Sequence, residues 1–236
     1  MALPVVNASR YSTTLPSTGQ EIEYRPYLVK EEKIMMVALE SKDKKAIMRA
    51  MKDVAQACVF TDIIIDSLTS FDLEWLFLKL RTKSVGENTR VKLKCEDEGC
   101  NKSSEVNVNL DDISLSKINE NKVIQLTDDI GVVMKYPQIG MLEEHDEETI
   151  QTPDGAFNMI IDCLETIYDE DNVYQVIDES RESIKGFIDN LNSLQFGMIA
   201  DWLKDMPSLE KDIEWNCVAC NKENAVKLRG LQSFFT

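Results

Sequence analysis

Two similar cysteine hairpins set the strongest constraint on how this chain can fold. The first reads VKLKCEDEGCNKSSEVNVNL and carries Cys95 and Cys100. The second reads DIEWNCVACNKENAVKLRGL and carries Cys217 and Cys220. In each, an alternating segment is followed by a turn between two cysteines, the dipeptide Asn-Lys and a second alternating segment. Alternation at a period of two is typical of β-strands, so each stretch predicts a β-hairpin with two thiols at its tip.

Two such hairpins can supply four thiolates to a single metal ion. Zinc favours this ligand set in structural sites, where it is tetrahedral with Zn–S bonds of about 2.3 Å. The spacings C-x4-C and C-x2-C are each weak signals, but two hairpins that resemble each other are a stronger one. We therefore predict a structural Zn²⁺ site, the signature of a split zinc ribbon, with the ligands Cys95, Cys100, Cys217 and Cys220.

The distance between the two hairpins along the chain is unusual for a zinc ribbon. Cys100 and Cys217 are separated by 116 residues. A helical insertion whose ends lie together would resolve this, because loop-closure entropy grows only with the logarithm of loop length. Two separate pairs of reduced thiols, or a site that has lost its metal, are the alternatives. Four thiolates leave no open position for water, so we expect a structural rather than a catalytic metal.

The pattern along the rest of the chain predicts an α+β fold with a helical body. Residues 1–27 form an extended arm or hairpin that turns at 16–19, and residues 28–88 form a helical bundle. Residues 89–136 and 208–236 form the split zinc-ribbon-like β module. Residues 137–207 form an acidic loop and a helical insertion, with helical patterns over 154–169 and 180–206 and with Thr152 as the cap of the first.

The charge of the chain constrains its partners. It has 236 residues, 26 Lys and Arg against 42 Asp and Glu, and a net charge of -16, which argues against a protein that coats nucleic acid. Between residues 141 and 180 stand 13 acidic residues and no Lys or Arg. A solvated face explains such a segment most simply, and a surface for a basic partner is the alternative.

The sequence has no export signal and no apolar run long enough to span a membrane, so we expect an intracellular protein with reduced thiols and no membrane contact. Nucleotide-binding, nucleophile-elbow and zinc-protease motifs are missing, and the only histidine is His145, in an acidic stretch. We therefore expect neither an enzyme nor a small-molecule substrate. Cys58 and Cys163 lie on apolar helical stripes and are interpreted as core residues.

Three segments are candidate contact surfaces. The arm from Leu3 to Pro26 could add a strand to a partner's sheet, or could be an edge strand of this protein. Phe234 and Phe235 are either core residues or an anchor into a neighbour. Because Trp75 and Leu76 are adjacent on a helix, they cannot both face one way, and one of them is a docking candidate.

The sequence resembles the baseplate hub proteins of T-even-like bacteriophages, which have contractile tails. The phrase YRPYLVKEEK together with FDLEWLFLKLRTKSVGE carries the resemblance most specifically, and the similarity extends over essentially the whole chain. It implies a hub subunit or a hub assembly factor that acts by contacts with other tail proteins. It also implies assembly in the cytoplasm of the infected bacterium, with or without retention in the virion baseplate.

A zinc-ribbon adaptor that binds nucleic acid or transcription machinery is the competing interpretation. It rests on the basic residues around the two hairpins, which would form a local patch on an acidic protein. Net charge and the lack of interleaved aromatic residues stand against it. The basic residues are Lys92, Lys94, Lys102, Lys222, Lys227 and Arg229.

Overall fold

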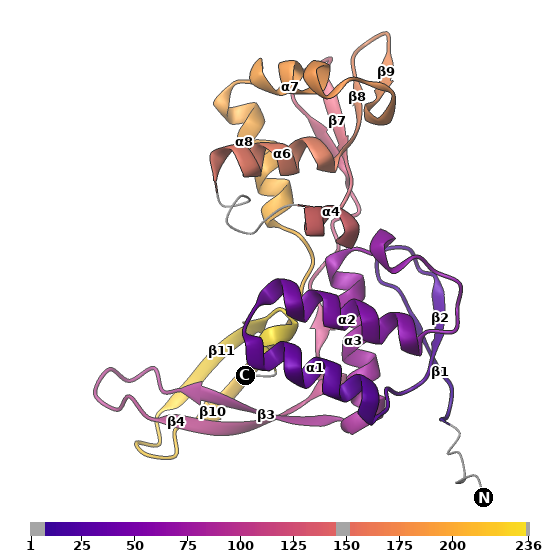
Figure 1. Ribbon diagram of the computed structural model, residues 1–236. Helices are drawn as coiled ribbons and strands as arrows, with labels where there is room; N and C mark the ends of the chain where they lie inside the picture. The colour runs from indigo at the N-terminus through magenta and orange to yellow at the C-terminus, as the bar shows by residue number, and fades with distance from the viewer. Residues whose placement is uncertain (1–7, 145–151, 235–236) are drawn as a thin grey trace, which may run out of the picture. The chain divides into compact units, whose positions relative to one another are not determined.

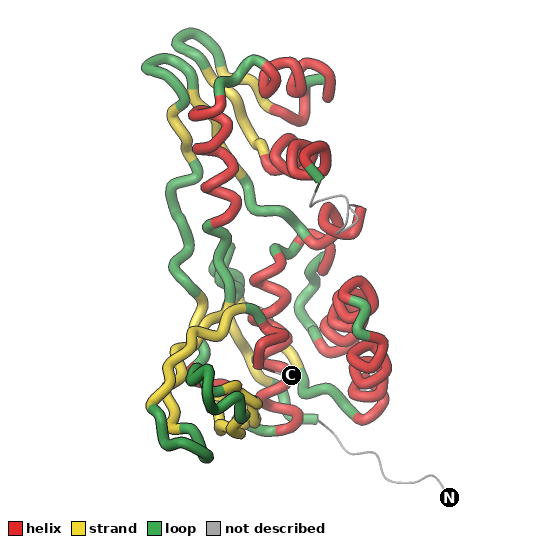
Figure 2. The backbone as a smooth tube through the Cα atoms, turned by 90° about the vertical axis from the view of Figure 1, so that its left-hand side faces the viewer, coloured by secondary structure: helices red, strands yellow, loops and turns green. Residues whose placement is uncertain are grey.

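The computed structural model describes residues 8–144 and 152–234, and the chain divides into two compact units. The first unit contains residues 1–65, 71–116 and 208–236, and the second contains residues 66–70 and 117–207. Both mix helices with small antiparallel sheets, as Figures 1 and 2 show. In the described residues, no helix combines the length and the apolar character needed to cross a membrane.

The first unit begins with the predicted hairpin. Strand β1 (Tyr11–Thr14) pairs with β2 (Glu21–Tyr24), and Gly19 has a φ of 72° in the turn between them. A positive φ suits glycine because it has no Cβ. Leu15 and Ile22 are buried, at 1% and 0% exposure, so the hairpin is packed onto its own unit.

Three helices follow and form the helical part of this unit. They are α1 (Val29–Ser41), α2 (Lys44–Cys58) and α3 (Ser70–Val85). The short helix η1 (Ile65–Ser67) before α3 lies mostly in the second unit. Helix α3 is buried on most of its circumference, because Leu73, Leu76, Leu78 and Leu80 are all at 0% exposure. Its apolar residues therefore form the centre of the core around which the hairpin and the other helices pack.

The two cysteine hairpins complete the first unit. Strand β3 (Asn88–Lys94) pairs with β4 (Ser103–Asn109), and β10 (Leu209–Asn216) pairs with β11 (Glu223–Arg229). The short strand β5 (Ser114–Leu115) adds to the free side of β10. Helical turns follow β4 and β11, namely η2 (Leu110–Asp112) and η4 (Leu231–Phe234).

The second unit combines a four-stranded antiparallel sheet with helices. The strands lie in the order β6 (Val123–Gln125), β7 (Gly131–Met134), β8 (Leu164–Tyr168) and β9 (Val173–Gln175). The helices are α4 (Ile139–Glu144), α6 (Pro153–Cys163), α7 (Arg181–Asp189) and α8 (Ser193–Lys204), with η3 (Val176–Asp178) before α7. Apolar side chains from the sheet and helices give this unit its own core, including Val132, Met134, Ile139, Leu164 and Ile199 at 0% exposure.

The helices of the second unit differ from the sequence prediction in two places. The helix predicted to reach residue 169 ends at Cys163, because the next five residues pair with β7 as strand β8. The helical pattern over 180–206 is two helices. Asn192 separates them, since its side chain accepts hydrogen bonds from the amides of Leu194 and Gln195 and caps α8. Thr152 caps α6 as predicted, through the amide of Gly155.

Residues 117–136 are in the second unit, whereas the sequence analysis grouped them with the cysteine hairpins. The strands β6 and β7 alternate like the other strands, and they join β8 rather than β3 or β10. Alternation shows that a segment is a strand but not which strand it pairs with. Pairing of β7 with the distant strand β8 therefore places β6 and β7 in the second unit.

A nearly buried ion pair joins three elements of the first unit. The guanidinium of Arg25, after β2, contacts the Glu31 carboxylate of α1 at 3.0 Å and donates to the carbonyl of Ala57 in α2 at 2.9 Å. Glu31 also accepts from the amide of Leu28 and caps the start of α1. Burial alone raises the pKa of the Glu31 carboxyl, but the hydrogen bonds from Arg25 and Leu28 outweigh it and lower the pKa below its ordinary value.

We predict that Glu31→Gln lowers the free energy of unfolding by about 3 kcal/mol at neutral pH, because the buried Arg25 loses its carboxylate partner. Because folding lowers the pKa of Glu31, the ionised carboxylate stabilises the folded protein at pH values above the ordinary carboxyl pKa. The difference between Glu31→Gln and the wild type should therefore shrink as pH falls through the folded-state pKa. Urea unfolding at several pH values measures this.

The control is Lys30→Gln, which removes a 3.4 Å contact to the same carboxylate from a side chain that is 73% exposed. Exposed pairs contribute about 0–1 kcal/mol, so this variant should unfold almost like the wild type. If both variants lost the same free energy of unfolding, the Arg25 contact would not be the one that stabilises the protein.

Candidate metal centre

The two cysteine hairpins repeat the same backbone hydrogen bond. The amide of Cys95 donates to the carbonyl of Lys102 at 2.8 Å, and the amide of Cys217 donates to the carbonyl of Lys222 at 2.9 Å. Each bond closes the turn that carries the cysteine pair, between β3 and β4 or between β10 and β11. The lysine of the shared Asn-Lys dipeptide thus contributes its backbone carbonyl to this geometry.

The backbone conformation of the turn explains why asparagine stands before the lysine in both hairpins. Asn101 and Asn221 have φ values of 49° and 58°, in the left-handed region. Asparagine adopts this region more readily than most residues that have a side chain. The similarity between the two stretches is therefore a similarity of turn conformation.

The four cysteines that the sequence selected come together at the tips of the hairpins. The sulfurs of Cys95 and Cys220 are 3.7 Å apart, as are those of Cys100 and Cys217. All four lie within 4.8 Å of one another. Each short contact joins the first hairpin to the second, so neither hairpin forms a separate pair.

These distances suit a metal ion better than disulfides. A disulfide has an S–S bond of about 2.05 Å, and all four cysteines are free thiols. A tetrahedron with metal–sulfur bonds of about 2.3 Å has edges of about 3.8 Å, close to the two short contacts. The four sulfurs could therefore bind one ion with small adjustments.

Side chains also join the two hairpins without any metal. Asn224 accepts a hydrogen bond from the amide of Glu96 at 2.9 Å and donates to the carbonyl of Lys222 at 2.7 Å. Ser104 accepts from the amide of Val218 at 3.2 Å. Both polar side chains belong to buried residues, at 4% and 3% exposure. Sequence reasoning missed them, because a bond across two distant hairpins leaves no local pattern.

Backbone amides surround the sulfurs. The amide of Asp97 donates to the Cys95 sulfur and the amide of Ala219 donates to the Cys217 sulfur, each at a distance of 3.5 Å. Amides of Ala219 and Cys220 lower the pKa of Cys217 to about 6, so this thiol is ionised at neutral pH. The amide of Asp97 has the same effect on Cys95, but burial and the neighbouring sulfurs outweigh it and raise the pKa of Cys95. Amide donors of this kind favour thiolates, the form that binds metal.

The other two cysteines have a different environment. Cys58 and Cys163 are at 0% exposure, in agreement with the prediction that they are core residues. Burial raises the pKa of the Cys58 thiol to about 11 and that of Cys163 to about 12. Neutral thiols of this type behave as small apolar side chains.

A family model described as T4 bacteriophage base plate protein matches residues 8–236. The chain belongs to this family. Membership of this baseplate family implies contacts with other tail or baseplate proteins and assembly in the host. The chain matches no curated protein and no solved structure.

Several residues of the candidate contact surfaces make contacts within this baseplate protein instead. The Trp75 indole donates to Thr13 at 3.1 Å, the Lys79 ammonium lies 4.3 Å from its ring centroid, and Leu76 is buried. Phe234 is a core residue at 0% exposure. Of the arm from Leu3 to Pro26, residues 8–26 are described and belong to the first unit. Residues 3–7, His145 and Phe235 lie outside the described residues.

The basic residues around the hairpins of the baseplate protein are interleaved with acidic ones. Lys227 contacts Glu210 at 3.5 Å and Asp212 at 3.6 Å. Arg229 donates to the hydroxyl of Ser208. The loop between Cys95 and Cys100 is itself acidic, as it contains Glu96, Asp97 and Glu98. This interleaving weakens the electrostatic attraction that nucleic acid would need.

We predict that Asn101 and Asn221 tolerate glycine but not valine. Glycine adopts a positive φ freely, so Asn221→Gly should change the free energy of unfolding by only a few tenths of a kcal/mol. A β-branched side chain is strained there, so Asn221→Val should lower it by about 1–2 kcal/mol. Urea unfolding measures both, and equal losses would contradict a conformational role for asparagine.

Proposed function

We propose that the protein is a hub subunit or hub assembly factor of a T4-like phage baseplate, acting through protein–protein contacts. We further propose that its first unit is stabilised by a structural Zn²⁺ bound to Cys95, Cys100, Cys217 and Cys220. The observation that carries the metal proposal is the set of sulfur distances, because contacts of 3.7 Å between hairpins suit a tetrahedral ion. The family match supports a baseplate role, and the hub assignment within the baseplate rests on the sequence resemblance.

The proposed ion would have a mechanical role. It would join the tip of β3–β4 to the tip of β10–β11, where Asn224 and Ser104 are the other side-chain connections described above. Structural zinc contributes apparent binding free energies of about 10–16 kcal/mol in small domains. That is large beside two hydrogen bonds of about 1 kcal/mol each. A baseplate component needs such rigid surfaces, since its neighbours dock on them.

We also propose that the protein has no catalytic activity. Four thiolates would fill the coordination sphere of the ion, so no position would be left for an activated water. The two remaining thiols are buried and neutral, which makes them poor nucleophiles. This proposal agrees with a role in assembly.

Elemental mass spectrometry tests the metal. We expect about one zinc per chain in freshly purified protein and none in the Cys95→Ser/Cys217→Ser variant, which should also unfold at lower urea concentration. The matched control is Cys58→Ala, which removes a thiol outside the cluster and should keep its zinc. Protein purified without chelator that contains no zinc, with six free thiols, would refute the site.

The hub role is tested by co-expression with the hub proteins of the same phage, one at a time, followed by size-exclusion chromatography. We expect a stoichiometric complex with a hub protein and none with an outer-baseplate protein as control. Mass spectrometry of purified virions then separates a retained subunit from an assembly factor. Normal baseplates from a phage in which this gene is deleted would refute both roles.

The competing adaptor role is tested by nucleic-acid binding at several salt concentrations. Binding whose affinity falls steeply with salt would favour it, because released counterions drive such binding. The acidic residues beside Lys227 and in the Cys95–Cys100 loop lead us to expect no such binding.

A further inference from the structure

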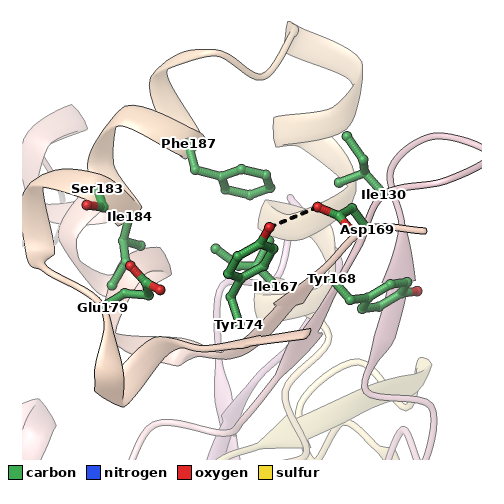
Figure 3. Close-up of a pocket in the computed structure, with 9 residues that line it drawn as sticks. All are labelled: Ile130, Ile167, Tyr168, Asp169, Tyr174, Glu179, Ser183, Ile184 and Phe187. Atoms are coloured by element: carbon green, nitrogen blue, oxygen red, sulfur yellow. Dashed lines mark hydrogen bonds between the residues drawn. The ribbon is translucent and has the colours of Figure 1, made fainter. Parts of the chain in front are cut away.

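The second unit contains an aromatic cavity with acidic groups at its edge. It has a volume of about 290 Å³ and lies between α7, β8, β9 and the turn after β6. Figure 3 shows nine residues that line it. Ile184, from α7, is buried at 5% exposure, and Ile130 and Ile167 add apolar surface from the turn and β8.

Two aromatic side chains from different elements line this cavity. Tyr174 projects from β9 and Phe187 from α7, and in Figure 3 the Phe187 ring lies above the hydroxyl end of Tyr174, which is turned to Asp169. Tyr174 is 39% exposed, so a ligand can reach its ring. The electron-rich faces of aromatic rings attract cations, and arginine is the cation found there most often.

A carboxylate, that of Asp169, is held in place at one side of the cavity. Its Oδ1 accepts from the amides of Asp171 and Asn172 at 2.9 and 2.8 Å, and its Oδ2 accepts from the Tyr174 hydroxyl at 3.1 Å. These hydrogen bonds lower the pKa of Asp169, beginning with the two backbone amides, so the group is ionised at neutral pH. The carboxylate is therefore preorganised to accept a further charged hydrogen bond.

A second carboxylate, that of Glu179, lies on the other side of Tyr174 in Figure 3. Among the described residues, Glu179 forms no ion pair. None of the nine residues in Figure 3 is cationic. Arg181, two positions further on, is engaged with Asp162 at 2.6 Å and with Asn158 at 3.1 Å. The two negative charges are thus not neutralised by a cation within the cavity.

Two exposed apolar residues lie near Tyr174 in the sequence. Val173 and Ile177 are 66% and 91% exposed, and they flank Tyr174 along the chain. Interfaces commonly surround a central charged or aromatic anchor with apolar contacts that exclude water. Ile177 and Val173 do not line the cavity, but they leave apolar surface on the same part of the chain.

We propose that this cavity receives an arginine side chain from another baseplate protein, with the guanidinium between Tyr174 and Phe187 and hydrogen-bonded to Asp169 or Glu179. Arginine fits better than lysine because its planar guanidinium stacks on rings and forms paired hydrogen bonds to carboxylates. Residues 152–180, with eight acidic residues and no Lys or Arg, would attract a basic partner to this unit. This inference rests on the proposed baseplate role for the identity of the partner but not for the chemistry of the site.

The test is an NMR titration of the isotope-labelled full chain with the blocked tripeptide acetyl-Gly-Arg-Gly-amide at low ionic strength. We expect saturable shifts at the amides of residues 169, 174 and 187. The lysine tripeptide should bind more weakly than the arginine tripeptide. The citrulline tripeptide keeps the shape of arginine but loses its charge, and it should bind at least about tenfold more weakly, which corresponds to about 1.4 kcal/mol of binding free energy.

Two isosteric variants on one surface provide the control. Glu179→Gln removes a charge that lines the cavity, whereas Glu182→Gln removes one from the first turn of α7 that does not. Glu179→Gln should weaken binding several-fold and Glu182→Gln should leave it nearly unchanged. Phe187→Leu should weaken binding while the chain stays folded, as its amide spectrum will report.

Three results would overturn the proposal. These are the absence of saturable shifts at the cavity, equal weakening by the two glutamine variants, and equal binding of arginine and lysine tripeptides. Loss of the hub complex with intact tripeptide binding would instead overturn the proposed hub role and leave this site standing.

Discussion

The pairing of β5 with β10 is the constraint on which the rest of the first unit depends. The amide of Ser116 donates to the carbonyl of Ser208, and the amide of Ser208 donates to the hydroxyl of Ser116, both at 2.9 Å. The long excursion over residues 117–207 therefore begins and ends at one place of this unit, separate from the short excursion at 66–70. Closing a flexible loop of this length costs on the order of 4 kcal/mol, and doubling it adds only about 0.6 kcal/mol. An insertion with its own core and adjacent ends thus keeps the two cysteine hairpins within reach.

Much of the cysteine cluster could be predicted from the sequence, because the patterns that indicate it are local. Alternation, the cysteine spacings and the repeated Asn-Lys each depend on a few neighbouring residues, and the left-handed turns at Asn101 and Asn221 follow from them. The contacts of Asn224 and Ser104 were not readable, since their partners are more than 100 residues away. Strand β8 was missed for a similar reason. Its sequence continues the apolar pattern of α6, and only pairing with β7 makes it a strand.

The six cysteines show how the same side chain acquires different properties. Cys58 and Cys163 lie among apolar groups, where an ionised thiol would lose its hydration, and the pKa of each is raised. Cys217 is buried too, at 2% exposure, but backbone amides point at its sulfur and lower its pKa. Burial alone therefore does not decide whether a cysteine can be a ligand. Nearby amides lower the pKa of Cys217, whereas at Cys95 burial and the neighbouring sulfurs outweigh the amide of Asp97 and raise the pKa.

The proposed metal site and the aromatic cavity lie in different units. The aromatic cavity is formed entirely by residues of the second unit, and all four clustered cysteines belong to the first. The ends of the insertion are joined by hydrogen bonds at Ser116 and Ser208, which involve no thiol. Loss of the metal should loosen the contact between the hairpins while the core around Val132 and Leu164 stays packed. The proposed arginine binding should then survive removal of the proposed zinc, because the groups that would hold an arginine do not depend on the sulfurs.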